Sequence, residues 1–240
     1  MTTEDYVRHE VDGRLSRIVL DRPEAANRIH STMMRQLIDA LAAATDAGSE
    51  VVLITAAGRD FSVGRDQHEV LPEGFSKLDN TRLIVDANRL LTGFPGITVA
   101  AAQGRALGFG CGVVVQSDIA LAAASAELGF DEVHHGTAPA FVMSYLEEHV
   151  GPKRALDLIV TGRTLSAAQA EQWGIVTRVV SPELLAASAE ELVAGLLRSP
   201  GELLARCKAY LRENRTVPPA DRLEHAFETF ARRMRAAAQA

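Results

Sequence analysis

The sequence predicts a mixed α/β fold that ends in a helical portion, and two observations support this class. Apolar runs typical of buried strands alternate with helical patterns as far as about residue 182. Beyond that point only helical patterns follow, at about 183–198, 200–214 and 220–238. We therefore expect an α/β core over residues 1–182 and a helical portion over residues 183–240.

The first half of the core follows from local patterns. Residues 15–20 alternate around an isoleucine and stop at a proline turn, which predicts a strand. A helix capped by His30 or Ser31 comes next, because apolar residues then recur at helical spacing. The continuous apolar runs 51–55 and 97–102 predict strands that are buried on both faces of a sheet.

The remaining elements of the core are read in the same way. Residues 68–81 lack sustained periodicity and predict a surface loop or short helical turns. In order along the chain, we further expect a helix over 83–91, a strand over 118–122, an extended polar crossing segment over 127–136, helices over 141–150, 152–160 and 166–173, and a short strand over 177–180.

Composition describes an ordinary globular protein, since 47% of the 240 residues are hydrophobic and 23% are charged. The formal net charge of −6 argues against a nucleic-acid or anionic-membrane surface. The acidic N-terminus lacks the basic and apolar pattern of a signal peptide, and we expect a cytoplasmic protein. Cys111 and Cys207 stand in unrelated contexts, so neither a disulfide nor a metal site is expected.

Two glycine-bearing turns each follow a predicted strand, at 57–66 and at 105–112. In the second turn, Gly108, Gly110 and Gly112 precede an apolar segment that reads as a helix. Unpaired amides at a helix N-terminus favour negative charge, which is the geometry of an oxyanion hole. The alternative is a tight turn that only packs a buried helix against the sheet.

Taken in order, the motifs 20–27, 52–58, 61–66, 101–112, 117–119 and 158–163 resemble those of the crotonase superfamily, also called the enoyl-CoA hydratase/isomerase family. The resemblance runs from Ile18 to about Lys208. It implies a crotonase-like spiral of strand-strand-helix units and a lyase or isomerase of fatty acid metabolism. Such enzymes stabilise a thioester enolate, and the coenzyme A thioester is a substrate, with no bound prosthetic group and no metal expected.

The resemblance places the two oxyanion amides at Arg65 and Phe109. Hydratases of the family hold a water between two glutamates, and here the first of these positions is Gly112, which carries no titratable side chain. The second position, Glu132, is retained and implies a single acid/base. This pattern favours double-bond isomerisation, while hydration stays open if Glu132 and a histidine hold the water.

Two further readings stay open. His134 or His135 would serve a carbon-carbon hydrolase that acts on a diketone, and His135 is the histidine we include among the catalytic candidates. On an extended segment the two side chains would point to opposite sides. The absence of a carboxylate at Gly112 and the short C-terminus would also suit a non-catalytic binding subunit with a crotonase fold.

For coenzyme A, the resemblance suggests contacts at Ala26, Arg28, Asp66 and Gln67. The lysine that the family often carries just before the Asn27 motif is absent. The expected partners are therefore an acyl-CoA small molecule and further copies of the chain, as a homotrimer or a dimer of trimers, with no nucleic acid and no membrane. Oligomer contacts and the lid of the pocket are expected in residues 183–240 of the C-terminal portion, while the active site is expected in the α/β core.

Overall fold

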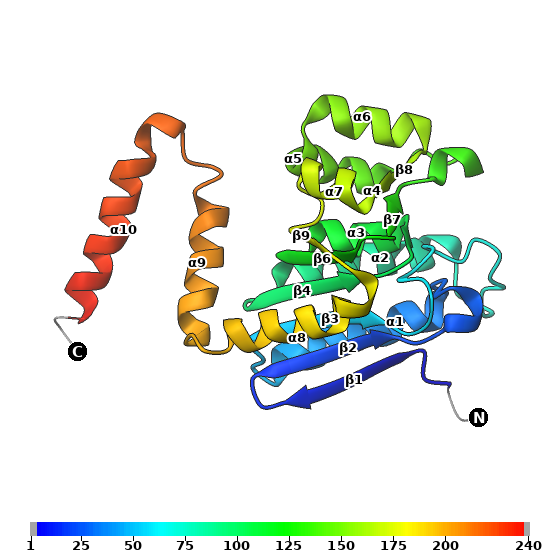
Figure 1. Cartoon of the computed structure of the whole chain (residues 1–240), viewed down its shortest axis with the longest axis horizontal. Helices are drawn as coiled ribbons and strands as arrows, with labels where there is room; N and C mark the ends of the chain where they lie inside the picture. Colours follow the sequence, from blue (N-terminus) through cyan, green and yellow to red (C-terminus); the bar gives the residue numbers. More distant parts are fainter. Residues whose placement is uncertain (1–3, 238–240) are drawn as a thin grey trace.

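The computed structural model describes residues 4–237, which form a body built on sheets and two helices that extend from it (Figure 1). The main sheet has six strands in the order β1-β2-β3-β4-β6-β9. Their bounds are β1 Val7–Asp12, β2 Leu15–Leu20, β3 Val51–Ala56, β4 Ile97–Ala102, β6 Ile119–Ala123 and β9 Arg178–Val180. All neighbouring strands are parallel except β1 and β2, which form an antiparallel hairpin.

Helices cover both faces of the central strands, and this explains the continuous apolar runs. Every residue of β4 is buried, as are the first four of β3. Helix α8 (Leu185–Leu196) contacts β3, β4 and β6 and is drawn in front of the sheet, whereas α1 (Ser31–Asp46) lies behind it (Figure 1). The alternating strands and helices predicted for the core are confirmed.

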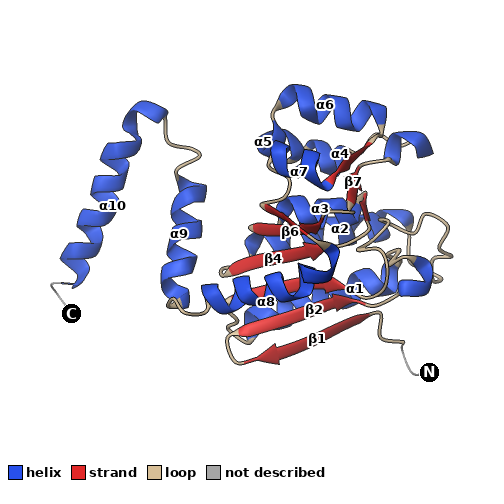
Figure 2. Ribbon diagram, in the orientation of Figure 1, coloured by secondary structure: helices blue, strands red, loops and turns tan. Residues whose placement is uncertain are grey.

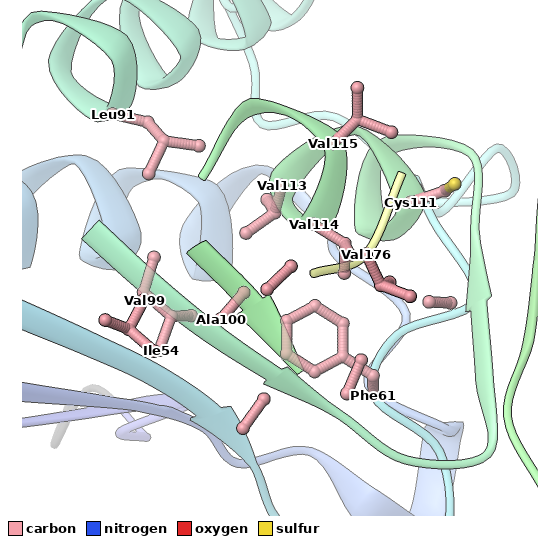
Figure 3. Close-up of a cluster of buried hydrophobic side chains, with 14 of the residues drawn as sticks. Ile54, Phe61, Leu91, Val99, Ala100, Cys111, Val113, Val114, Val115 and Val176 are labelled. Atoms are coloured by element: carbon pink, nitrogen blue, oxygen red, sulfur yellow. The ribbon is translucent and has the colours of Figure 1, made fainter. Parts of the chain in front are cut away.

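A short central helix, α3 (Phe109–Gln116), lies between the sheet and α2 (Lys77–Gly93). Seven of its eight residues are buried. Figure 3 shows Val113 and Val114 on the side of α3 that faces a cluster including Ile54, Val99 and Phe61. The apolar core therefore fixes α3, and with α3 the glycine turn that opens it.

A second sheet of three short strands lies beside α3 and has the order β5-β7-β8. Its strands are β5 Arg105–Leu107, β7 Glu127–Gly129 and β8 Thr164–Ser166, and the helices near it are α4 Ala140–Met143, α5 Leu146–Val150, α6 Pro152–Thr161 and α7 Ala167–Trp173. The single helix expected over 141–150 is wrong, because the chain breaks between α4 and α5 at Ser144 and Tyr145. Figure 2 shows these short elements above the main sheet.

The segment after β7 also differs from the prediction. Residues Glu132–His135 form a 3-10 helix and not an extended strand, because Gly136 adopts a left-handed conformation and its N–H donates to the carbonyls of Glu132 and Val133. The predicted loop over 68–81 is shorter than expected, since Ser76 and Asp79 form a capping box that starts α2 at Lys77.

The last two helices, α9 (Gly201–Glu213) and α10 (Arg222–Ala237), extend away from the body (Figure 1). Buried Lys208 anchors α9, because its ammonium donates to the carbonyls of Phe94 and Gly96 and pairs with Asp118 at 2.6 Å. None of the helices between residues 4 and 237 has the length and apolar character of a membrane span.

Candidate active site

The two glycine turns predicted from the sequence meet in the structure. Gly64 and Gly108 both have positive φ, 85° and 51°. A Cβ atom on Gly64 would lie 3.0 Å from the carbonyl oxygen of Leu107, and one on Gly108 would lie 3.7 Å from the Cα of Gly64. Only residues without side chains allow this approach. The contact brings the next residues, Arg65 and Phe109, to the same place.

Both predicted amides are free of partners in the described part of the chain. Phe109 is the first residue of α3, and the first N–H of a helix has no acceptor within it. On either side of Arg65, the carbonyl of Gly64 accepts from the N–H of Ile29, and the N–H of Asp66 donates to the carbonyl of Ile29. The N–H of Arg65 lies between these two hydrogen bonds and takes part in neither. Two unpaired N–H groups from separate turns can bind one anionic oxygen.

The side chain of Arg65 holds its turn in position. Its guanidinium pairs with Glu69 at 3.1 Å and bonds to Asn80 on α2. Glu69 in turn accepts from the amide of Asn80 at 2.6 Å and from the N–H of Ser31 at 2.7 Å. This partly buried group fixes the turn against α1 and α2, and no sequence motif pointed to Glu69 or Asn80.

The carboxyl group of Glu132 lies against the second turn. A Cβ on Gly108 would be 3.1 Å from Glu132 Oε1, and Glu132 Oε2 is buried without a hydrogen-bond partner among the described residues. Burial raises the pKa of Glu132 and Asp131 adds to the rise, although a backbone hydrogen bond and His135 oppose it. A partly desolvated carboxyl group next to the free amide of Phe109 can carry a proton to and from a bound molecule.

A residue that the sequence reasoning missed, Tyr145, occupies the space beside Gly112. A Cβ on Gly112 would lie 2.6 Å from the hydroxyl oxygen of Tyr145. Burial raises the pKa of Tyr145, and Cys111 and Glu132 add to the rise, so all three groups are neighbours. The sequence showed only that Gly112 supplies no carboxylate, and no motif pointed to Tyr145.

The two histidines are placed less centrally. The imidazole of His135 is half exposed and lies 3.5 Å from the carboxylate of Asp131. The imidazole of His134 lies against Gly162, next to α6. Because both residues belong to a 3-10 turn, the expectation that they alternate on an extended segment is wrong.

The four residues proposed for coenzyme A lie on two segments joined by backbone hydrogen bonds. Val63 donates to Ala26 at 3.2 Å, and Asp66 donates to Ile29 at 2.9 Å. Arg28 and Gln67 are exposed on these segments. The carboxylate of Asp66 is committed to Arg22 at 3.3 Å and to the N–H of His68.

That carboxylate stays ionised in spite of its position. Burial alone would raise the pKa of Asp66, yet the hydrogen bonds from His68 and Arg22 hold it below its usual value. The structure thus gathers all four residues at one edge beside the Arg65 turn, with exposed Arg28 as their one side chain of fixed positive charge.

Several curated proteins are related to this chain in sequence. The chain is 36% identical to the "probable enoyl-CoA hydratase" of Rhizobium meliloti over 73% of its own length and 69% of that protein. It is 31% identical to the 2,3-dehydroadipyl-CoA hydratase of Escherichia coli, over 85% of this chain and 80% of that one.

Among solved structures, an enoyl-CoA hydratase of Mycobacterium smegmatis superimposes with a TM-score of 0.86 at 26% identity, covering 96% of this chain and 91% of that one. A structure from Thermobifida fusca in complex with CoA superimposes with a TM-score of 0.84 at 27% identity, covering 98% and 95% of the two chains. The family model described as enoyl-CoA hydratase/isomerase matches residues 10–237. The chain therefore belongs to the enoyl-CoA hydratase/isomerase family, with the crotonase fold that its motifs predicted.

Proposed function

We propose that this protein acts on acyl-CoA thioesters through an enolate, with the amides of Arg65 and Phe109 as the oxyanion hole and Glu132 as the single acid/base. The observation that carries the proposal is the buried carboxyl group of Glu132, which lies against Gly108 beside the free amide of Phe109. Family membership and the CoA-bound structural relative support the substrate class. Gly112 supports isomerisation over hydration, because it supplies no second carboxylate.

The proposed reaction moves one proton. The carboxylate of Glu132 removes a proton from C2 of a 3-enoyl thioester, and the electron pair passes to the carbonyl oxygen. The resulting enolate oxygen accepts hydrogen bonds from Arg65 N–H and Phe109 N–H. The double bond shifts, and the carboxylic acid of Glu132 returns the proton to C4. Each amide is worth about 2.7–4 kcal/mol of barrier height in enzymes that use such donors.

The coenzyme A end of the substrate is proposed to lie along the segments of Ala26, Arg28, Asp66 and Gln67. Backbone hydrogen bonds join these two segments, and Arg28 is exposed on one of them. An exposed arginine suits a phosphate group, which binds best where the guanidinium is not already paired with a carboxylate.

The experiment that tests the reaction compares purified wild-type protein with Glu132→Gln on 2-enoyl-CoA and 3-enoyl-CoA. We expect interconversion of the double-bond isomers, and a loss of about 10²–10⁴-fold in kcat for Glu132→Gln. The matched control is Glu127→Gln, at the exposed first residue of β7. His135→Ala tests the histidine alternative and should cost less, since that ring is half exposed and faces Asp131. Turnover that survives Glu132→Gln unchanged would remove Glu132 from the mechanism.

For the assembly, we propose a homotrimer or a dimer of trimers that uses the portion 183–240, where α9 and α10 also close the pocket. The support is an apolar stripe on α10, in which Leu223 is 87% exposed and Phe227 is 64% exposed. Such a stripe on a helix that leaves its own body needs a covering surface. We also propose a cytoplasmic location, which the free thiols of Cys111 and Cys207 support.

A further inference from the structure

We propose that Tyr145 is a substrate-contacting hydrogen-bond donor that takes the place of the side chain absent at Gly112. Its hydroxyl would favour acyl-CoA thioesters whose acyl chain carries a neutral acceptor oxygen, a ketone or a hydroxyl group, close to the thioester. This inference rests on the proposed function, because it concerns the same pocket and the same class of substrate.

The geometry that carries the inference lies along the first turn of α3. Glu132 Oε1 lies next to the Cα of Gly108, and the hydroxyl of Tyr145 lies next to the Cα of Gly112. The two glycines belong to the same turn, since the N–H of Gly112 donates to the carbonyl of Gly108 at 2.9 Å. These two positions are four residues apart, slightly more than one helical turn and about 6 Å along the axis. The carboxyl group and the phenol therefore flank one short length of acyl chain, at the end of α3 that carries the amide of Phe109.

The phenol is available to a ligand. Within the part of the chain that the structure describes, the hydroxyl of Tyr145 makes no hydrogen bond to another residue, and Cys111 and Glu132 are its neighbours. A partly buried hydroxyl without a protein partner can donate a hydrogen bond to an acceptor that a ligand brings to it. A water held there would meet a donor and one carboxylate, not the two carboxylates of a hydratase.

The charge of the pocket selects the acceptor. Because burial and Glu132 both raise the pKa of Tyr145, the phenol stays protonated and donates a hydrogen bond without giving up its proton. A carboxylate on the acyl chain would be repelled by the ionised form of Glu132. A ketone or hydroxyl oxygen avoids this repulsion and still accepts from Tyr145.

Binding of two matched ligands tests the inference without turnover. The dissociation constants of 3-oxobutanoyl-CoA and butanoyl-CoA are measured by calorimetry for wild type, Tyr145→Phe and the control Tyr6→Phe. Tyr6 lies just before β1, and its hydroxyl donates to the carboxylate of Glu4 in an exposed hydrogen bond of 2.7 Å. We expect Tyr145→Phe to weaken 3-oxobutanoyl-CoA about tenfold. Butanoyl-CoA should bind within twofold of wild type, and Tyr6→Phe should change neither ligand.

The outcomes separate this inference from the proposed function. If Tyr145→Phe leaves 3-oxobutanoyl-CoA unchanged, or weakens both ligands equally, the role of Tyr145 is refuted while acyl-CoA binding stands. If the wild-type protein binds neither ligand, the proposed function fails and this inference fails with it. The ring is retained in Tyr145→Phe, so its packing between α4 and α5 persists and folding is not at issue.

Discussion

The contact between Gly112 and Tyr145 predicts a coupling that can be measured as stability. In Gly112→Ala the new methyl group would lie 2.6 Å from the hydroxyl oxygen of Tyr145. Overpacking of this kind costs about 1–3 kcal/mol. Alanine also gains about 0.8–1.0 kcal/mol over glycine inside a helix. The two terms together leave Gly112→Ala between neutral and about 2 kcal/mol less stable than wild type.

Removing the hydroxyl of Tyr145 removes the overpacking cost of Gly112→Ala. In the Tyr145→Phe background, the nearest remaining atoms are the ring carbon Cζ at 3.7 Å and Gln116 Nε2 at 3.8 Å, which are ordinary contacts. Only the higher helix propensity of alanine then remains, and Gly112→Ala should stabilise the protein by about 1 kcal/mol. The coupling between the two substitutions is therefore about 1–3 kcal/mol.

Urea unfolding of the four proteins measures this coupling through the midpoints and slopes of the transitions. Equal effects of Gly112→Ala in both backgrounds would show that the hydroxyl is not beside Gly112. In that case the reasoning about the pocket, and not only the magnitude, would be refuted.

Two further predictions concern pH and assembly. Because burial raises the pKa of Glu132 above 4.5, kcat/KM should rise with pH through that higher pKa, and the acid limb should be lost in Glu132→Gln. The folded state holds the proton of Glu132 more tightly than the unfolded state, so the free energy of unfolding should fall as pH rises from 4.5 through the raised pKa. This loss should be absent in Glu132→Gln. A stability difference between wild type and Glu132→Gln that does not change with pH would contradict the prediction. For the assembly, Phe227→Glu on α10 should produce species of lower mass in sedimentation, because it places a charge on the apolar stripe. The control Val70→Glu, at a loop residue that is 95% exposed, should leave the mass unchanged. An unchanged mass in Phe227→Glu would argue against α10 as the contact between subunits.

The sequence predicted the elements that carry a long apolar run or a sustained helical spacing of apolar residues. The runs that became β3 and β4 are apolar because both faces of the sheet are covered, and this signal is strong. Strand β1 was missed because its residues are mostly polar and exposed, and its pairing with β2 depends on the turn at Gly13. The strands β5, β7 and β8 have three residues each, too few for periodicity to register.

The candidate site was predictable only where its groups follow motifs. The turns of Arg65 and Phe109 and the carboxylate of Glu132 lie on segments with ordered spacing. Tyr145 lies at a break between two short helices, and no local pattern relates it to Gly112, which is 33 positions earlier in the numbering. Contacts of this kind depend on the packing of the small sheet and its helices, and this packing appears only in three dimensions.

The close approach of Gly64 and Gly108 has a consequence for comparing relatives. On the proposed assignment, the groups that hold the enolate are parts of the main chain, and the side chains at Arg65 and Phe109 are free to differ between proteins. Sequence identity at those two positions then carries little information about whether the reaction centre is intact. The informative positions are the paired glycines, since any side chain at Gly64 would press on the carbonyl of Leu107 and displace both amides together.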